Sequence, residues 1–502
     1  MLRLPFLALA LTLASGAFAQ GTCTDGSASF GGTSYSCNGV DVAAVIPVGT
    51  TSPFRSGALN DIWGWTDPQD GKEYALVGTR SGVVFVDVST PASPRVLGKL
   101  QTSVPNGFAA WRDVKTYGNY AVVVAEVGGH GMQVFDLTRL RGLSEDSNRD
   151  FEEDALYVGI GNAHNIVVDE ASGFAYAVGA RNVPTCGGTG LHMIDIRQPL
   201  APTYAGCFDE DGYTHDAQCV VYDGPDTDHT GKQICLASNE DTLTIVDVTD
   251  KSSPIQIARG FYPNPSYTHQ GWFTEDKRFF IVNDELDDSD GGTRTFVFDV
   301  SDLDNPDFTF RYDSPLAVTD HNLYVRGNFV YQSNYEGGLR ILDAASIASG
   351  TFAEAGHFDT YPQSNNATFN GQWSNYPYFA SGTVIASDIN NGLFVLRPEP
   401  RFFAVAEEPA PEAEAAYALS LPEPNPASER STLSLRVDAA QLVYAALYDL
   451  TGRRLATLLD RAVASGETVA LEVNGSALPA GVYVVRVAGE TFEASERVSI
   501  VR

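Results

Sequence analysis

Four histidines occupy corresponding places near the start of successive repeat units: His164, His215, His269 and His321. Neutral imidazole nitrogen is a good metal ligand, so rings that converge on a common channel can bind a metal ion. Asp216 or Asp320 could then orient a ring from a second layer. The alternative is that each histidine bridges neighbouring backbones by hydrogen bonds, because repeats reproduce structural residues as readily as functional ones.

An acidic loop at 283–292 offers a second kind of metal site. Its carboxylates are those of Asp284, Glu285, Asp287, Asp288 and Asp290. Calcium takes 6–8 oxygen ligands, often from closely spaced carboxylates, so Ca²⁺ is the candidate cofactor here. The spacing is not that of an EF-hand, and a solvated hairpin tip is the alternative. Residues 226–231 form a weaker second candidate.

The six cysteines indicate disulfide bonds. Exported proteins with an even number of cysteines commonly pair them, although six cysteines allow 15 pairings. Pairing neighbours in the sequence is the simplest arrangement, and no pair has the close C-x-x-C spacing of a zinc ribbon. The predicted disulfides are Cys23–Cys37, Cys219–Cys235 and, by elimination, Cys186–Cys207.

Motifs for nucleophilic or phosphate chemistry are missing from the sequence. It contains no Gly-x-Ser-x-Gly, no His-Glu-x-x-His and no Gly-x-x-x-x-Gly-Lys. Aromatic residues near the unit starts could line a sugar-binding face, or they could simply pack between units. The tryptophans among them are Trp63, Trp65, Trp111, Trp272 and Trp373.

Composition narrows the classes of partner. Of 502 residues, 63 are Asp or Glu and 32 are Lys or Arg, so the formal net charge is −31. Nucleic acid and anionic lipid repel such a chain, and we expect neither as a partner. Hydrophobic residues make up 43% of the chain, which is enough to bury a sizeable core.

Residues 1–19 are typical of a secretory signal peptide. Arg3 supplies the positive start, 4–13 is a short apolar run, and 17–19 fit the small-x-small cleavage rule. A membrane anchor is the alternative, but the run is too short to cross about 30 Å of hydrocarbon. No later segment is long and apolar enough to form a transmembrane span.

A short strand-like phrase recurs through residues 40–400. It ends in Asp in six copies and in Arg in the seventh, at Asp87, Asp136, Asp195, Asp247, Asp299, Asp343 and Arg397. Successive copies lie 49, 59, 52, 52, 44 and 54 residues apart, and a period near 50 suits a four-stranded propeller blade. Residues 42–46 are an unassigned strand candidate that would complete the last blade, because an open ring leaves exposed edges.

The predicted fold is all-β, a seven-bladed β-propeller over residues 20–400 followed by a small Ig-like β-sandwich over 418–502. Residues 401–417 are rich in Pro, Ala and Glu and are expected to form a solvated linker. Short strand candidates separated by Gly and Pro turns favour the sandwich.

The repeat phrases resemble the LVIVD repeat of secreted bacterial propellers called choice-of-anchor B proteins. The most family-like stretches are 213–218, 238–247, 267–271 and 320–324. The resemblance extends over residues 20–400 and implies a β-propeller outside the cell. It implies no established reaction, so no catalytic residue is carried over.

The C-terminal module is similar to the sorting domain of the bacterial type IX secretion system. The matching stretches are 424–426, 448–453 and 478–483. The resemblance implies passage through the inner membrane and periplasm by the leader, then through the outer membrane with the type IX machinery as partner. Such a domain is usually removed, which leaves the mature protein extracellular or attached to the outer cell surface.

We favour a non-enzymatic binding module whose ligand is an extracellular protein or a glycan, because a repeat without a recognisable catalytic set suggests binding. A metal-dependent hydrolase with a His/Asp site at the propeller channel is the first alternative, since a bound metal could activate water. A surface-layer structural protein is the second.

Overall fold

A computed structural model describes residues 20–49, 54, 57–144, 149–181, 183–187, 189–287, 292–403, 417–449, 453–489 and 492–501. The chain divides into two compact units, Met1–Ala404 and Val405–Arg502, and each is treated by itself below. The predicted leader lies outside the described residues, as does most of the predicted linker. Within the described part of the chain, no helix has the length and apolar character needed to cross a membrane.

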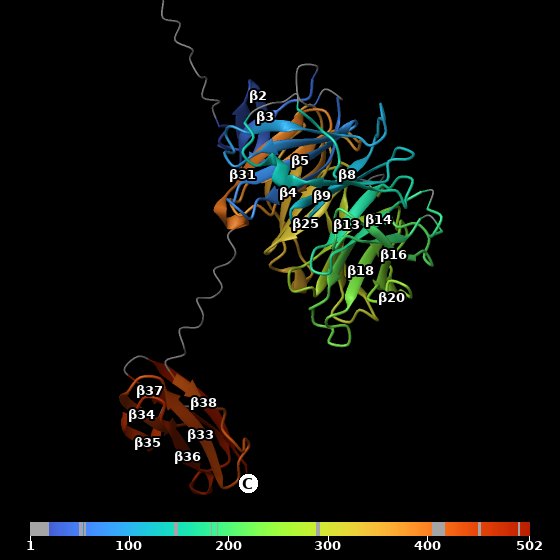
Figure 1. The fold of residues 1–502 in the computed structure, drawn as a ribbon. Coiled ribbons are helices and arrows are strands. Elements are labelled where there is room, and N and C mark those ends of the chain that lie inside the picture. Colours follow the sequence, from blue (N-terminus) through green and yellow to red (C-terminus); the bar gives the residue numbers. More distant parts are fainter. Residues whose placement is uncertain are drawn as a thin grey trace, which may run out of the picture. The chain divides into compact units, whose positions relative to one another are not determined.

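The described residues of the first unit form seven sheets (Figure 1). The first holds β4 (Leu59–Thr66), β5 (Glu73–Thr79), β6 (Gly82–Asp87), β7 (Arg95–Gln101) and the short β11 (Asp150–Phe151). The second holds β8 (Arg112–Tyr117), β9 (Tyr120–Ala125), β10 (Met132–Asp136) and β12 (Ala155–Tyr157). The third holds β13 (Asn165–Asp169), β14 (Phe174–Val178), β15 (Leu191–Asp195) and β16 (Thr203–Phe208).

In the remaining four sheets, neighbouring strands pair antiparallel. The fourth holds β17 (Asp216–Val221), β18 (Gln233–Ser238), β19 (Leu243–Asp247) and β20 (Ile255–Gly260). The fifth holds β21 (Thr268–Phe273), β22 (Phe279–Asp284), β23 (Arg294–Asp299) and β24 (Asp307–Asp313). The sixth holds β25 (Leu323–Arg326), β26 (Phe329–Ser333), β27 (Leu339–Asp343), β28 (Ala353–Phe358) and the added hairpin β1 (Ser27–Phe30) and β2 (Thr33–Asn38). The seventh holds β29 (Gln372–Tyr376), β30 (Val384–Asp388), β31 (Gly392–Pro398) and β3 (Val40–Ile46).

The recurring Asp of the repeat is a turn residue. It ends the third strand of each of the first six sheets, and one carboxylate oxygen accepts a hydrogen bond from the backbone N–H two residues later at 2.8–3.0 Å. Such local bonds stabilise the turn that follows the strand. The seventh copy has the exposed Arg397, because β31 continues to Pro398 before the chain turns. The repeat thus records a structural need rather than a binding site.

The first unit closes into a ring. Each of the innermost strands β4, β8, β13, β17, β21, β25 and β29 lies against the next, and β29 lies against β4. The last sheet takes its outer strand from the N-terminus: β3 pairs antiparallel with β31, with Val42 opposite Leu396 and Val45 opposite Phe394 (Figure 1). The prediction that residues 42–46 complete the last sheet is confirmed by this pairing.

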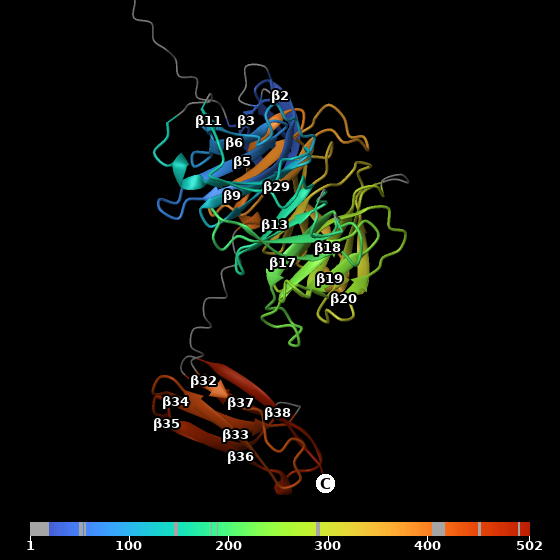
Figure 2. The same cartoon turned by 45° about the vertical axis from the view of Figure 1, so that its right-hand side comes forward.

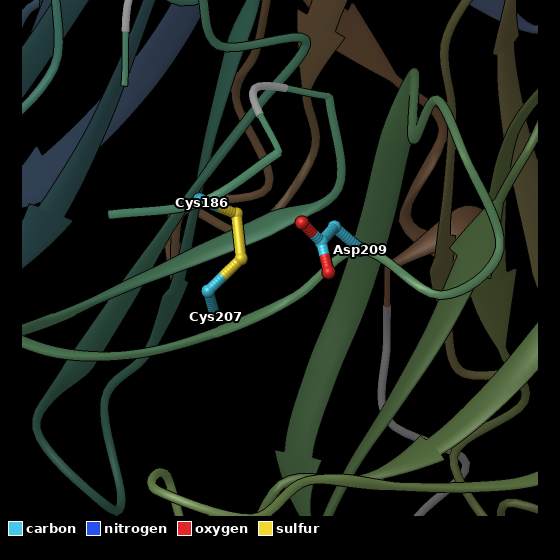
Figure 3. A group of neighbouring side chains, drawn as sticks. All are labelled: Cys186, Cys207 and Asp209. Carbon is cyan, nitrogen blue, oxygen red and sulfur yellow. A yellow bond between two sulfur atoms is a disulfide. The ribbon is translucent and has the colours of Figure 1, made fainter. Parts of the chain in front are cut away.

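All six cysteines form the predicted disulfides. Cys23–Cys37 joins the N-terminal segment to β2, and Cys219–Cys235 links directly opposite residues of β17 and β18. Cys186–Cys207 ties a loop to β16 (Figure 3). These bonds fix segments at the N-terminus and in the third and fourth sheets of the ring.

The second unit consists of two sheets that share one apolar core (Figure 2). One sheet contains β32 (Tyr417–Leu419), β33 (Arg430–Val437) and β36 (Thr468–Asn474). The other contains β35 (Arg454–Val463), β34 (Gln441–Tyr448), β37 (Gly481–Ala488) and β38 (Glu493–Ile500). Alternating burial along β33 and β36 places one face of that sheet in the core, as a two-sheet sandwich requires. The all-β prediction is therefore confirmed for both units.

Ring closure predicts a large effect of a charge on β3. The Val42 side chain is fully buried, so Val42→Asp leaves an unpaired carboxylate in the core and should cost at least about 3 kcal/mol of unfolding free energy. Thermal unfolding followed by circular dichroism measures the change. Ile255→Asp, on an outer strand where the side chain is 61% exposed, is the matched control and should cost less than about 0.5 kcal/mol. Equal melting temperatures for the wild type and Val42→Asp would contradict closure through β3.

Candidate functional site

The four predicted histidines form a continuous row. His164, His215 and His321 lie just before β13, β17 and β25, and His269 is the second residue of β21, so all four stand where an innermost strand begins. The ring centroids are 4.4 Å apart between His164 and His215 and 4.3 Å apart between His215 and His269. The distance between His269 and His321 is 4.5 Å. Residues that lie about one repeat apart in the sequence are thus brought into van der Waals contact by neighbouring sheets.

Three of the rings are oriented by a hydrogen bond from Nδ1. His164 Nδ1 donates to Glu126 Oε1 at 2.8 Å, and His321 Nδ1 donates to the Trp373 carbonyl oxygen at 2.6 Å. His215 Nδ1 is hydrogen-bonded to the Tyr267 hydroxyl at 2.8 Å. The Nδ1–H of His164 and His321 leaves the Nε2 lone pair of each ring available, which is the arrangement seen behind metal-binding histidines.

Burial disfavours the charged form of three of the four imidazoles, those of His215, His269 and His321. Desolvation, with a smaller contribution from neighbouring histidines, lowers the pKa of His215 and His269 well below the usual value. Desolvation likewise lowers the pKa of His321 to about 3. Neutral imidazole is the form that binds metals. His215 Nε2 is buried and has no hydrogen-bond partner among the described residues. The row therefore contains a ring nitrogen that could bind a ligand.

Glu285 belongs to the histidine row. Its Oε2 lies 3.7 Å from His269 Nε2, its Oε1 lies 3.9 Å from His321 Nε2, and the Tyr335 hydroxyl donates to Oε1 at 2.7 Å. One ligand atom from each of Glu285, His269 and His321 fits within 4.8 Å. The two separations are near the ~3.4 Å edge of a tetrahedron built from ~2.1 Å metal–ligand bonds. Glu285 was predicted only as a member of the acidic loop, and its proximity to His269 and His321 was not predicted.

The other residues of the acidic loop have different surroundings. Asp284 accepts hydrogen bonds from the backbone N–H groups of Ser266 and Tyr267 and from the Tyr262 hydroxyl, so it holds the loop that enters β21. Asp287 is buried and faces Arg294, with 3.8 Å between Oδ2 and Nη1. Asp288 and Asp290 lie outside the described residues. Calcium binding by this loop stays a prediction.

Asp320 is a buried carboxyl next to the row. Its side chain is 2% exposed, and neither oxygen has a hydrogen-bond partner among the described residues. Desolvation, and then the charges of Asp287, Asp284 and Glu285, raise the pKa of Asp320 well above its usual range. The proposed role of Asp320 in orienting an imidazole is not supported by any hydrogen bond to a histidine among the described residues.

Two further groups of ligand-type atoms lie outside the channel. Cys186, Cys207 and Asp209 are neighbours, but the two sulfur atoms are joined in a disulfide and cannot act as thiolate ligands (Figure 3). Asp226, His229 and Asp304 form the second group, in the region of the weaker calcium candidate. There Asp226 Oδ2 accepts from the Leu303 N–H at 2.9 Å and His229 Nε2 lies 3.0 Å from Asp304 Oδ2, so these side chains link the fourth sheet to the fifth.

A layer of carboxylates and one lysine lies immediately beyond the histidines. Lys115 Nζ is 2.5 Å from Asp113 Oδ1 and 4.0 Å from Asp61 Oδ2. Burial raises the pKa of Asp113 to about 6 and that of Asp216 to about 8. Asp216 Oδ1 accepts a hydrogen bond from the Ala217 N–H at 2.7 Å, and its role in orienting a histidine ring stays a prediction. Lys115 was missed because a single lysine in a strand has no distinguishing sequence pattern.

The row ends at Arg112, the first residue of β8. Its Nε donates to the Thr79 carbonyl oxygen at 2.9 Å and its Nη1 donates to His130 Nε2 at 2.9 Å. His130 Nδ1 in turn donates to the Gly131 carbonyl oxygen at 3.0 Å. His130 thus accepts through one nitrogen and donates through the other, as only the neutral imidazole can do.

The predicted tryptophans lie in different environments. Trp373 packs on His321 with ring centroids 4.6 Å apart, and the 42% exposed Trp111 lies 6.2 Å from His164. Trp65 is buried and donates its Nε1–H to the Gly118 carbonyl oxygen, so its role is packing. Trp63 and Trp272 line a cavity of the first unit.

Comparisons with known proteins agree with this description. Residues 424–501 match the secretion system C-terminal sorting domain, and residues 72–102 and 230–259 match the LVIVD repeat. No curated protein matches the chain. The chain therefore contains LVIVD repeats and a sorting domain, as both resemblances implied. A sorting domain together with three disulfides is typical of a secreted or cell-surface protein.

Solved structures with similarity include β-propellers. The β-propeller domain of Cps50 (Swd1) from Myceliophteria thermophila is 13% identical with a TM-score of 0.44, over 68% of this chain and 98% of that chain. A protein from Lactobacillus plantarum is 13% identical with a TM-score of 0.43, over 83% and 99%. A functionally unknown protein from Desulfotomaculum acetoxidans is 11% identical with a TM-score of 0.41, over 62% and 87%.

His130 predicts a pH dependence of stability. Desolvation, and then the charge of Arg112, lower the pKa of His130 to about 4, whereas the unfolded chain titrates near 6.5. The stabilisation is complete above about pH 6.5 and is lost as the pH falls toward 4, up to roughly 3 kcal/mol. His130→Gln should therefore show a smaller decrease in unfolding free energy between pH 7 and pH 4.5 than the wild type.

Denaturant unfolding at a series of pH values measures this difference. Tyr176→Phe is the control, because it alters a buried side chain that does not titrate in this range, and its curve should run parallel to that of the wild type. A parallel curve for His130→Gln as well would contradict the neutral imidazole.

Proposed function

We propose that this protein is an exported, non-enzymatic binding propeller that holds a divalent transition metal at the channel, with His269, His321 and Glu285 as ligands. The observation that carries the proposal is the row of buried imidazoles with the Glu285 carboxylate beside its last two members, His269 and His321. Zinc takes nitrogen and carboxylate ligands in such sets.

The surroundings of the three ligands support a preformed site. The Trp373 carbonyl oxygen fixes the His321 tautomer, and the Tyr335 hydroxyl fixes one oxygen of Glu285. Groups held in this way lose little freedom when a metal binds, which favours affinity. His215 lies one ring further along the row, and its Nε2, which has no hydrogen-bond partner in the part of the chain that the structure describes, extends the polar surface available at the site.

A metal-dependent hydrolase is the second candidate. Two histidines and one glutamate leave a fourth position open, and catalytic zinc sites keep such a position for water. We place binding first because the sequence contains none of the nucleophile motifs considered above. Hydrolysis of model esters or peptides by the zinc-loaded chain but not by the chelated chain would reverse this order.

The proposed location is outside the cell. The leader-like residues 1–19 would direct the chain to the periplasm, where the three disulfides can form, and the C-terminal unit would direct it through the outer membrane. The type IX secretion machinery is then the first partner of the chain.

The metal proposal is tested by zinc binding to the full chain after chelation. Isothermal titration calorimetry should give one bound Zn²⁺, and Glu285→Gln should weaken binding about tenfold or more, because it removes the anionic ligand while keeping the side-chain shape. His229→Asn removes an imidazole of the group outside the channel and should leave the affinity unchanged. A wild-type chain that takes up no zinc, or an unaffected Glu285→Gln variant, would overturn the proposal.

The export proposal is tested by removing residues 424–501 in a host that carries the type IX machinery. The shortened chain should accumulate in the periplasm, whereas the full chain should reach the cell surface or the medium. Fractionation with immunoblotting distinguishes the two locations. A variant with Arg430→Ala, at an exposed residue of the C-terminal unit outside the stretches that resemble the sorting domain, controls for non-specific loss. Export of the shortened chain at the full-length level would show that this unit is not the export signal.

A further inference from the structure

A cavity of about 410 Å³ lies within the first unit, on the far side of the carboxylate layer from the histidine row along the same innermost strands. Asp216 and Gln270 line it, and each directly follows a histidine of the row. Lys115 lines it from β8. The volume falls in the lower part of the range of about 300–1,000 Å³ typical of small-molecule sites. The cavity therefore suits a small ligand rather than a polymer segment.

Five aromatic side chains line the cavity: Trp63, Trp272, Tyr324, Tyr376 and Tyr378. The Tyr324 ring meets Trp63 and Trp272 edge-on, with centroids 5.6 and 5.1 Å apart and interplanar angles of 69° and 75°. Trp63 meets Tyr376 in the same way, at 5.0 Å and 69°. The edge-on contacts fix the rings, and Trp63 and Trp272 are only partly buried, so indole surface remains for a ligand to stack on.

Two amide side chains that line the cavity use their oxygen atoms within the fold. Gln218 Oε1 accepts from the Phe273 N–H at 2.7 Å, and Gln270 Oε1 accepts from the Leu323 N–H at 2.8 Å. These bonds join neighbouring sheets and fix which end of each amide is used by the fold. The NH₂ group of each amide is a hydrogen-bond donor on a side chain that lines the cavity.

The Tyr378 hydroxyl is a further unused polar group. It is buried, it belongs to a side chain that lines the cavity, and it has no hydrogen-bond partner among the described residues. A buried hydroxyl without a partner costs free energy, which a ligand hydroxyl could recover.

Both ammonium groups at the cavity are paired with carboxylates, and Asp169 and Glu170 add two further carboxylates to its lining. Lys115, whose ammonium lies 4.8 Å from the centre of the Trp63 ring, is paired with Asp113 and lies near Asp61. Lys277, also at the cavity, is paired with Asp223 at 2.5 Å. A cationic ligand would meet the two ammonium groups, and an anionic ligand would meet the carboxylates behind Lys115. The partly exposed indole surface and the fixed amides suit a ligand with many hydroxyl groups, and the two paired ammonium groups and the additional carboxylates favour a neutral one over an anion.

We infer that this cavity binds a neutral saccharide of mono- or disaccharide size, which stacks on Trp63 and Trp272 and hydrogen-bonds to Gln218, Gln270 and Tyr378. The inference deepens the binding role proposed above and rests on it, but it does not depend on the metal. The sugar site and the metal site lie on opposite sides of the layer formed by Asp61, Asp113 and Lys115.

Saccharide binding is tested on the full chain by tryptophan fluorescence and isothermal titration calorimetry. The probes are glucose, galactose, mannose, N-acetylglucosamine and disaccharides of these sugars, with glucuronate and choline as the anionic and cationic comparisons. We expect saturable binding of at least one neutral sugar at millimolar or lower concentration, with a change in tryptophan emission, and weaker binding of glucuronate and choline.

Three variants locate the site. Tyr378→Phe should weaken the binding of that sugar about fivefold by removing one hydrogen bond, and Gln270→Glu should weaken it similarly, because it keeps the acceptor for the Leu323 N–H but loses the NH₂ donor. Tyr176→Phe is the matched control, since the Tyr176 hydroxyl is also buried without a partner among the described residues but does not line the cavity. Its affinity should equal that of the wild type, and melting temperatures confirm folding.

Glu285→Gln separates this inference from the metal proposal, because it should weaken zinc binding about tenfold or more and leave sugar binding unchanged. The inference is overturned if no neutral sugar binds, if choline or glucuronate binds more tightly, or if Tyr378→Phe and Tyr176→Phe have the same affinity. Zinc binding without sugar binding would leave the metal proposal standing alone.

Discussion

Closure of the ring of sheets is the constraint on which the first unit depends. Every innermost strand is covered on both sides only because β29 lies against β4 and because β3, from the N-terminus, supplies the outer strand of the last sheet. A sheet ring without this strand would leave the edge of β31 unpaired. The same closure determines function, since it brings the starts of consecutive innermost strands to one axis and so places residues about one repeat apart in contact.

Polar and charged side chains line the axis, and the free-energy cost of burying them is offset in different ways along its length. At one level the buried imidazoles make Nδ1 hydrogen bonds with Glu126, the Tyr267 hydroxyl and the Trp373 carbonyl oxygen. At the next level a lysine is shared between two carboxylates, which reduces the penalty of burying each charge. Beyond that, amide oxygens of Gln218 and Gln270 satisfy backbone N–H groups of neighbouring sheets. Most of these groups are thus structural, and the few unsatisfied atoms are the ones that point to ligands.

Much of the fold could be predicted from the sequence, because its signals are local or periodic. The Asp that ends each third strand makes a bond to the backbone two residues later, so it recurs wherever the turn recurs. Histidines at equivalent repeat positions had to become neighbours once the ring closed. Glu285 could not be predicted in the same way. Asp284 ends β22 and binds the loop before β21, while the next residue faces His269 and His321, and a run of acidic letters does not reveal that its members have different surroundings.

The two proposed sites share their backbone. His215 is followed by Asp216 and His269 by Gln270, so one residue of each pair belongs to the histidine row and the other lines the aromatic cavity. Gln270 is itself fixed by the Leu323 N–H at the start of β25, two residues after His321. A metal that drew His269 and His321 together would act on the same strand ends that position the Gln270 amide. Coupling between the sites requires these strand ends to have two arrangements that the ligands bind unequally. The register of β21 shifts at His269, but the antiparallel pairing of Gln270 with Asn283 and of Leu323 with Gln332 opposes such a change on the cavity side. The geometry therefore favours two sites that bind independently although their residues are adjacent in the chain.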